Sequence, residues 1–345
     1  MNRLLLALVI FLAGCSADAP PLPLAKPLVA AAADLKKLPG YDIGVYTPQA
    51  VDALVLQAPG LDNSELELRV WFPADADGDL PVVVFSHGNW SDRDKYDKLL
   101  GHWASHGYVV IAPTHLDGRS MARGIFNSLR YGQLGLISAR VDDVRYIMDN
   151  LAAIEGKVSA ASGASVRFRK NQLVIAGHSF GAFTAQQFAG AQAWDISESD
   201  SSPADVFIDP RVAGVVAISP PGPMFDVIHE KSWLQMRGPV LVTTGTWDSN
   251  AQFWPDWRMH LMSHETATAG DQFALVVEGA DHYLGNLICR PEREAKPQHN
   301  ALAIVNSASV AFLNAFLRSD EKAAAHLRSN ELQSVTKGFG QLLRR

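Results

Sequence analysis

The sequence predicts a protein of the α/β class, with a mainly parallel central sheet covered by helices on both faces. Two observations support this prediction. Short, continuous apolar runs recur along the chain, as expected of strands that are buried on both faces. Segments with apolar residues at helical spacing alternate with these runs, and this alternation is the order that builds a parallel sheet through helical crossovers.

The composition supports a large core and excludes several classes of protein. Of the 345 residues, 48% are hydrophobic and 19% are charged, which is far from the composition of a disordered chain. The net charge of −6 provides no basic surface for nucleic acid, so we expect no nucleic-acid partner. Two cysteines cannot build a disulfide scaffold or a four-ligand zinc site. We also find no Gly-rich phosphate loop and no H-E-x-x-H motif, and we name no metal ligands.

The N-terminal residues are typical of an export signal. A positive start at Met1–Arg3 precedes an uninterrupted apolar run from Leu4 to Ala13. A membrane-spanning helix needs about 20 apolar residues, so this shorter run indicates the hydrophobic part of a secretory signal. The run ends in Leu12-Ala13-Gly14-Cys15, which resembles the lipobox of bacterial lipoproteins.

This resemblance implies cleavage of a signal peptide, residues 1–14, and lipidation of Cys15. Because Ser16 rather than aspartate follows, it further implies a protein of the bacterial cell envelope anchored in the outer membrane. The alternative is ordinary secretion to the periplasm or medium, since Ala17-Asp18-Ala19 also fits an A-x-A cleavage site. Residues 15–40 are rich in proline and alanine, which favours a flexible tether ahead of one domain at 41–345.

The first elements of that domain follow from periodicity. Apolar and polar residues alternate over 65–72, which predicts a half-buried strand of the antiparallel type. Residues 80–85 are apolar throughout and follow an Asp/Gly turn, so they predict a central strand. A helix is expected at 94–106, ended by Gly107, and the apolar run 108–112 predicts the next buried strand.

The remaining elements continue the alternation of strand and helix. Residues 138–154 place their apolar side chains on one helical face. A strand at 173–176 is followed by a helix at 180–189. The later elements are strands at 212–218, 240–244 and 273–277 and a helix at 301–317.

One motif carries chemistry. Gly177-His178-Ser179-Phe180-Gly181 matches G-x-S-x-G, and it lies between a predicted strand and a predicted helix. A sharp strand-to-helix turn exposes the serine hydroxyl, and the two glycines remove side chains that would clash there. The alternative is a Ser/Gly turn without chemistry. The context favours Ser179 as a nucleophile.

A nucleophilic serine needs a base and an orienting acid, and in this kind of fold the order is serine, acid, histidine. Asp248 and His282 each follow a late predicted strand, at the edge of the sheet where ligands gather. We predict that His282 takes the proton of Ser179 and that Asp248 holds its ring. Asp226 is the reserve acid. Four other histidines are set aside because they lie before the last strand or open the final helix: His229, His260, His264 and His299.

The oxyanion formed on the substrate needs two backbone donors. We predict the N–H of Phe180, directly after the nucleophile, and that of Asn89, in the loop after the early central strand. Gly88 is expected to let this loop approach the substrate closely. Trp90 is expected to wall the pocket, and His87 to stabilise the loop by hydrogen bonds.

Four stretches resemble the α/β-hydrolase superfamily, most closely the branch of predicted dienelactone-hydrolase-like proteins and platelet-activating-factor acetylhydrolases. These stretches are Phe85–Gly88, Ala104–Val110, Gly177–Ala182 and Asp209–Val212. The resemblance implies an α/β-hydrolase fold and a serine carboxylester hydrolase that needs no cofactor. Dienelactone hydrolases use a cysteine nucleophile where this chain has Ser179, so their substrate is not implied.

The substrate class rests on fewer residues. Trp247 and Trp254 follow the strand before the predicted acid and, with Trp90, are candidates for an apolar pocket. We therefore expect short-chain or lipid-derived esters as substrates. Three arginines in the predicted loop after Pro113 are either contacts for a polar head group or solvated: Arg119, Arg123 and Arg130. The alternative function is a catalytically inactive lipoprotein that uses the same fold to bind.

Overall fold

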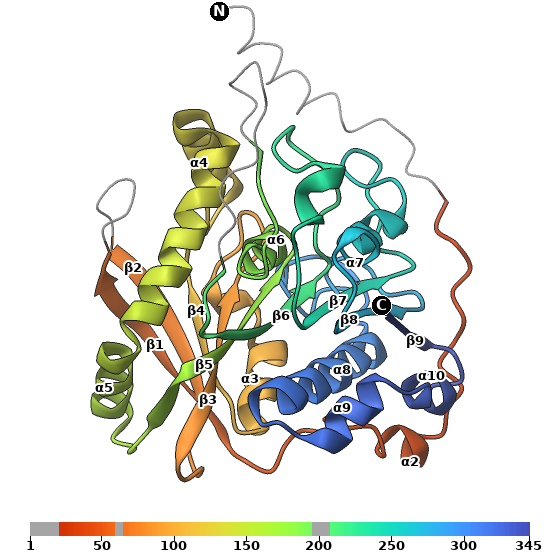
Figure 1. Ribbon diagram of the computed structural model, residues 1–345, viewed down its shortest axis with the longest axis horizontal. Coiled ribbons are helices and arrows are strands. Elements are labelled where there is room, and N and C mark those ends of the chain that lie inside the picture. The colour runs from red at the N-terminus through yellow and green to blue at the C-terminus, as the bar shows by residue number, and fades with distance from the viewer. Residues whose placement is uncertain (1–20, 59–64, 195–207) are drawn as a thin grey trace, which may run out of the picture.

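The computed structural model contains a mixed, mostly parallel sheet with helices on both faces, which confirms the predicted fold class (Figure 1). It describes residues 21–58, 65–194 and 208–345, so Cys15 and the expected signal peptide lie outside the described residues. The strands are β1 (Pro48–Gln57), β2 (Glu65–Pro73), β3 (Asp79–Ser86), β4 (Val109–Pro113), β5 (Arg167–His178), β6 (Val212–Ile218), β7 (Val240–Gly245), β8 (Gln272–Val277) and β9 (Gly340–Arg344).

The strand order is β1-β2-β4-β3-β5-β6-β7-β8-β9. Neighbouring strands from β4 through β8 are parallel, while β1, β2 and β9 pair antiparallel at the two edges. The antiparallel pairing of β2 agrees with its alternating sequence. The edge strands β1 and β9 escape sequence prediction because their side chains are largely exposed or half-buried, so neither shows the burial pattern of a central strand.

The helices that cover the sheet are α2 (Ala32–Leu35), α3 (Asp97–Ser105), α4 (Met121–Asp149), α5 (Leu151–Ser162), α6 (Phe180–Gln187), α7 (Met262–Thr266), α8 (His299–Leu317), α9 (Glu321–Leu327) and α10 (Glu331–Val335). Three short 3₁₀ helices are η1 (Arg93–Lys95), η2 (Glu230–Trp233) and η3 (Trp257–Leu261). Strand β3 shows how the core divides: Val82 and Val84 pack on the face covered by α4, α5 and α6, whereas Val83 and Phe85 pack on the face covered by α3 and α8.

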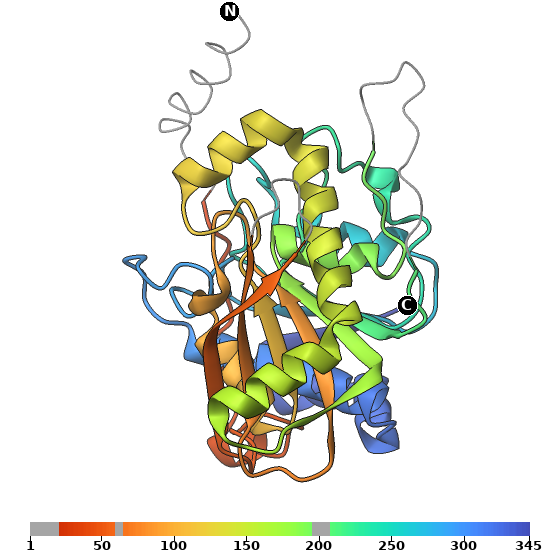
Figure 2. The ribbon, with the colours of Figure 1, turned by 90° about the vertical axis from the view of Figure 1, so that its left-hand side faces the viewer.

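The sequence prediction is wrong over the first half of α4. The residues after Pro113 were expected to form a loop up to residue 137, yet the helix begins at Met121. Only Gly124 and Asn127 are buried in this first part, so it lacks the core-facing stripe that identifies a helix in sequence. The helix bends at Gly132, where φ is +72°, and Figure 2 shows the resulting change of direction over the top of the domain.

Two further features concern the apolar helix α8 and the expected tether. Within the described residues, α8 is the one helix long and apolar enough to cross a bilayer, and 78% of its most apolar window is buried in the fold, as in a core helix. The described part of the expected tether lies against the domain. Leu35 and Leu38 are buried in the core, and the carbonyl oxygen of Pro39 accepts a hydrogen bond from Ser307. The packed chain thus begins before residue 41.

Candidate active site

Ser179 lies on a strained turn between β5 and α6. Its φ of 55° and ψ of −123° are rare for a residue with a side chain, and such strain is typical of functional turns. Its N–H donates to the carbonyl oxygen of Ile218 on β6 at 2.8 Å, which holds the turn in place. A Cβ on Gly177 would lie 2.1 Å from the carbonyl oxygen of Gly181, and one on Gly181 equally close to that of Ser86. Both glycines of the motif are therefore required by backbone contact.

Asp248 and His282 meet at the same end of the sheet. Asp248 follows β7 and His282 follows β8, and the Nδ1 atom of His282 lies 2.7 Å from Oδ1 of Asp248. The other carboxylate oxygen of Asp248 accepts a hydrogen bond from Thr244 at 3.1 Å. The reserve acid, Asp226, is exposed and has no hydrogen bond to His282 among the described residues. The structure thus brings Asp248, and not Asp226, to the histidine.

The hydrogen bond to Asp248 fixes the tautomer of His282. A carboxylate only accepts, so Nδ1 carries the proton and Nε2 has a free lone pair. Burial lowers the pKa of His282 below its usual value, although the charge of Asp248 opposes this. A neutral ring with an unprotonated Nε2 is the form that a general base needs.

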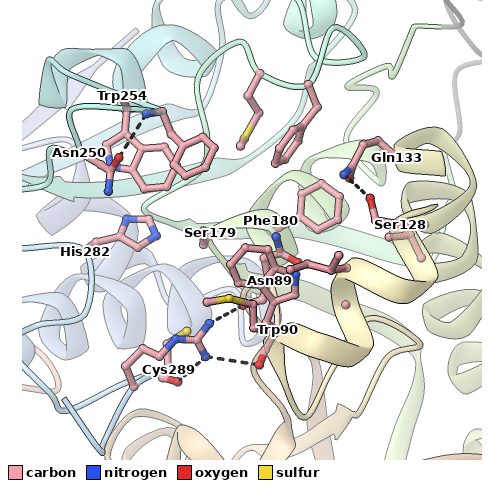
Figure 3. A pocket seen from close by; sticks show the side chains of 18 of the residues that line it. Asn89, Trp90, Ser128, Gln133, Ser179, Phe180, Asn250, Trp254, His282 and Cys289 are labelled. Carbon is pink, nitrogen blue, oxygen red and sulfur yellow. Dashed lines mark hydrogen bonds between the residues drawn. The ribbon is translucent and has the colours of Figure 1, made fainter. Parts of the chain in front are cut away.

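Ser179 and His282 line the same cavity (Figure 3). No hydrogen bond joins the Ser179 hydroxyl to His282 in the described part of the chain. Such bonds are often long before substrate binds and tighten in the complex. Trp254 lies against the imidazole of His282, with 4.8 Å between ring centroids, and so shields it from solvent on one side.

The two predicted oxyanion donors line this cavity as well. Phe180 is the first residue of α6, where an N–H has no partner within the helix. Neither its N–H nor that of Asn89 has an acceptor among the described residues. Two free donors at the cavity, one of them at the N-terminus of α6, suit a developing negative charge.

The cavity has a volume of about 360 Å³, at the lower end of the range for small-molecule sites. Trp90 and Trp254 line it, as the sequence predicts. Trp247 does not line it, and its indole N–H donates to the carbonyl oxygen of Pro23 at 2.7 Å. The apolar wall is completed mainly by α4 and two loops, through Met121, Ile125, Leu129, Leu136, Met224, Phe225 and Phe253.

The comparisons with known proteins agree with this geometry. The family model described as Chlorophyllase matches residues 41–250, which is more than half of the chain. This chain belongs to the chlorophyllase family. The family is an α/β-hydrolase-type esterase family, and its match includes Ser179 and Asp248 and ends before His282.

Two curated relatives match over a shorter stretch. A chloroplastic chlorophyllase-1 of Citrus unshiu is 32% identical over 76 residues, which is 22% of this chain and 22% of that protein. The chloroplastic chlorophyllase-1 of Citrus sinensis matches with the same identity and coverage. The matched stretch thus spans about a fifth of each relative.

Several residues that hold this chlorophyllase-family site were not found from sequence. Arg140 of α4 is buried, pairs with Asp117 at 2.7 Å, and donates to the carbonyl oxygen of His87 at 2.6 Å. Arg290 donates to the carbonyl oxygen of Asn89 at 2.8 Å. The two arginines hold the oxyanion loop from both sides. No local pattern marks them, because their partners lie in segments far from them along the chain.

Gly88 was expected to let its loop approach the substrate, but the structure gives it a different role. A Cβ on Gly88 would meet the side chains of His178, Cys289 and Tyr96 within 3.2 Å, so its close approach is to the protein itself. The Gly88 N–H donates to the Tyr96 oxygen at 2.9 Å, and Tyr96 contacts Nδ1 of His178 at 3.1 Å. Nε2 of His178 in turn donates to the carbonyl oxygen of His282 at 2.8 Å. Burial lowers the pKa of His178 to about 4, so this connection between the two loops is uncharged.

His87 makes the structural hydrogen bonds that we expect of it. Its Nδ1 donates to the carbonyl oxygen of Gly88 at 2.7 Å, and its Nε2 accepts from the N–H of His115 at 3.0 Å. Burial lowers the pKa of His87 well below its usual value, so the ring is neutral and both nitrogens are used within the protein.

Asp248, His260 and His282 also have the residue types of a metal site. However, the nitrogen of each histidine lies within 2.9 Å of one Asp248 oxygen. Ligands of a tetrahedral metal bound at about 2.0–2.2 Å are roughly 3.3–3.6 Å apart, so these contacts are closer than a shared ion requires. The donor geometry fits direct hydrogen bonds.

Proposed function

We propose that this protein is a serine carboxylester hydrolase that works through an acyl-enzyme, with Ser179, His282 and Asp248 as its catalytic triad. The observation that carries the proposal is the Asp248–His282 hydrogen bond at the wall of a cavity where Ser179 occupies a strained turn. Family membership supports the ester-hydrolase class. Family membership does not name the substrate of this chain, which is proposed below from the cavity.

Each step uses an atom whose surroundings suit it. Nε2 of His282 takes the hydroxyl proton as Ser179 attacks the ester carbonyl carbon. The N–H groups of Asn89 and Phe180 stabilise the oxyanion of the tetrahedral intermediate. The imidazolium then gives its proton to the departing alcohol, leaving the acyl group on Ser179. Water, activated by the same histidine, releases the acid and regenerates the enzyme.

The cavity favours an ester with an apolar acyl or alcohol part. Its wall is built from aromatic and aliphatic side chains, and the polar groups gather near Ser179 and His282. This arrangement supports short-chain or lipid-derived esters. The names of the Citrus relatives make chlorophyll one candidate to test on this chain.

A substrate panel on the purified protein tests the proposal. A chain-length series of p-nitrophenyl esters, together with chlorophyll, should show turnover whose kcat/KM varies with acyl length. Saturable binding of these esters with no turnover of any of them would instead favour the inactive binding protein.

The first part of α4 gives a reason to expect a substrate at a lipid surface. Met121, Phe126 and Leu129 are 55%, 62% and 65% exposed on one short helical stretch. Its charged residues are two exposed arginines, Arg123 and Arg130, in a chain whose net charge is −6. Because Met121 and Leu129 also line the cavity, the exposed apolar patch is continuous with the site. We propose that this stretch, Met121–Tyr131, contacts an anionic lipid surface.

Replacing Phe126 with serine tests this contact, because Phe126 does not line the cavity. In a Cys15→Ser background, Phe126→Ser should weaken binding to phosphatidylglycerol vesicles about three- to tenfold, from the lost burial of one aromatic ring. Turnover of p-nitrophenyl acetate should not change. Leu343→Ser is the matched control, since Leu343 is 40% exposed on the edge strand β9. Equal vesicle binding by all three proteins would contradict the proposal.

The lipobox-like sequence supports a second contact with membrane, through an acylated Cys15. We propose anchoring in the outer membrane of a bacterial envelope. Cys15→Ser should move the protein from the membrane fraction to the soluble fraction, because several acyl chains supply the anchoring. Cell fractionation and the mass of the mature N-terminus measure this. Unchanged fractionation with no lipid mass on the wild-type protein would favour ordinary secretion.

A further inference from the structure

A second histidine shares the carboxylate of the predicted triad. His260, in η3, is buried, and its Nε2 lies 2.9 Å from Oδ1 of Asp248, the oxygen that also faces His282. The same Nε2 is 3.1 Å from the carbonyl oxygen of Asp248. On the opposite side of the ring, Nδ1 is 2.6 Å from the carbonyl oxygen of Pro220.

These contacts determine the protonation of His260. Carboxylate and carbonyl oxygens accept hydrogen bonds and donate none. Each nitrogen of His260 faces only such oxygens, so each must carry a proton. A neutral ring would leave one nitrogen lone pair directed at an oxygen lone pair inside the protein, which is strongly unfavourable.

We propose that His260 is a permanent imidazolium and a positioning residue of the active site, which holds Asp248 ionised and aimed at His282. The proposal goes beyond the catalytic triad of the proposed function and rests on it. His260 does not line the cavity, so it acts on catalysis through Asp248 and His282 and not by touching the substrate.

The electrostatics of the three groups agree with this assignment. Burial alone would lower the pKa of His260, but the charge of Asp248 raises it above the usual value. Burial alone would raise the pKa of Asp248, yet His260 and His282 hold it well below its usual range. A positive charge on His260, whose ring centroid is 5.7 Å from that of His282, thus opposes the effect of the Asp248 charge on the pKa of His282.

His282 is therefore a weaker base than it would be if the charge of Asp248 were not shared with His260. His282 stays unprotonated to a lower pH than it would beside an unpaired carboxylate, so the acid limb of kcat/KM should lie below pH 6.5. Other titratable groups also surround His282. They are Asp248 after β7, His260 in η3, His178 at the end of β5 and the neighbouring Tyr283.

His260→Gln isolates the charge, because the amide nitrogen of glutamine can still donate to Asp248. We expect the acid limb of kcat/KM for a p-nitrophenyl ester to move up by about one pH unit. His264→Gln is the matched control, since His264 is a neighbouring buried histidine without contact to Asp248. The acid limb of kcat/KM for this variant should stay where it is in the wild-type protein. If the acid limb of kcat/KM in His260→Gln stays at the wild-type pH or moves to a lower pH, the proposal is overturned.

A measurement on the wild-type protein tests the charge of His260 without requiring any activity. In protein labelled with ¹⁵N-histidine, His260 should show two protonated ring nitrogens at pH 8, where exposed histidines are neutral. The His260→Gln spectrum assigns the signal. A neutral His260 at this pH would overturn the proposal even if the esterase activity is present, whereas an inactive protein with an imidazolium at His260 would contradict only the proposed function.

Discussion

Replacing Ser179 with alanine is expected to lower ester hydrolysis by about four to six orders of magnitude and to leave the protein folded. Alanine keeps the Cβ and therefore the same backbone strain at φ 55°, while the attacking oxygen is lost. Steady-state kinetics measure the loss of ester hydrolysis, and thermal unfolding measures whether the fold is retained. Labelling by a fluorophosphonate, which reacts with an activated serine, should also be lost.

The fold supplies a matched control for this experiment. Ser86, His115 and Asp143 form a second Ser-His-Asp series, with Oγ to Nε2 at 2.9 Å and Nδ1 to the carboxylate at 2.8 Å. Ser86 has no exposed surface and does not line the cavity, so its hydroxyl cannot reach a substrate. Ser86→Ala should keep turnover within about tenfold of wild type and keep the fluorophosphonate label. Near-wild-type turnover in Ser179→Ala would show that the nucleophile is elsewhere.

Replacing Asp248 with asparagine should lower kcat by roughly 10⁴-fold with little change in KM. The amide can present its N–H₂ to Nδ1 of His282, which favours the wrong tautomer and removes the charge that stabilises the imidazolium. Asp248 is fully buried between two histidines, so thermal unfolding is measured in parallel to separate catalysis from folding.

The variant Asp226→Asn, at the reserve acid, is the comparison for Asp248→Asn. Asp226 is exposed and its carboxylate does not reach His282, so Asp226→Asn should stay within a few-fold of wild type. The opposite ranking of the two variants would move the orienting role to Asp226. It would also remove the basis for a role of His260.

The sequence by itself determined the features that depend on neighbours in the chain. Buried parallel strands are continuous apolar runs, so β3, β4 and β6 could be located within a residue or two. The turn at Ser179 is equally local, because the glycines that permit it lie two residues away on each side. The sequence also points to Asp248 and His282, because their order along the chain and their places after strands restrict the candidates.

Only the tertiary structure decided which distant groups meet. His260 was set aside on sequence position, yet a short 3₁₀ helix with no periodic signal brings it to Asp248. Trp247 and Trp254 look alike in sequence, but the turn after β7 directs one toward Pro23 and the other into the cavity. The first part of α4 was missed because it packs on the site rather than on the sheet. Periodicity reports burial against the core, whereas hydrogen bonds between segments far apart in the chain leave no local pattern to detect.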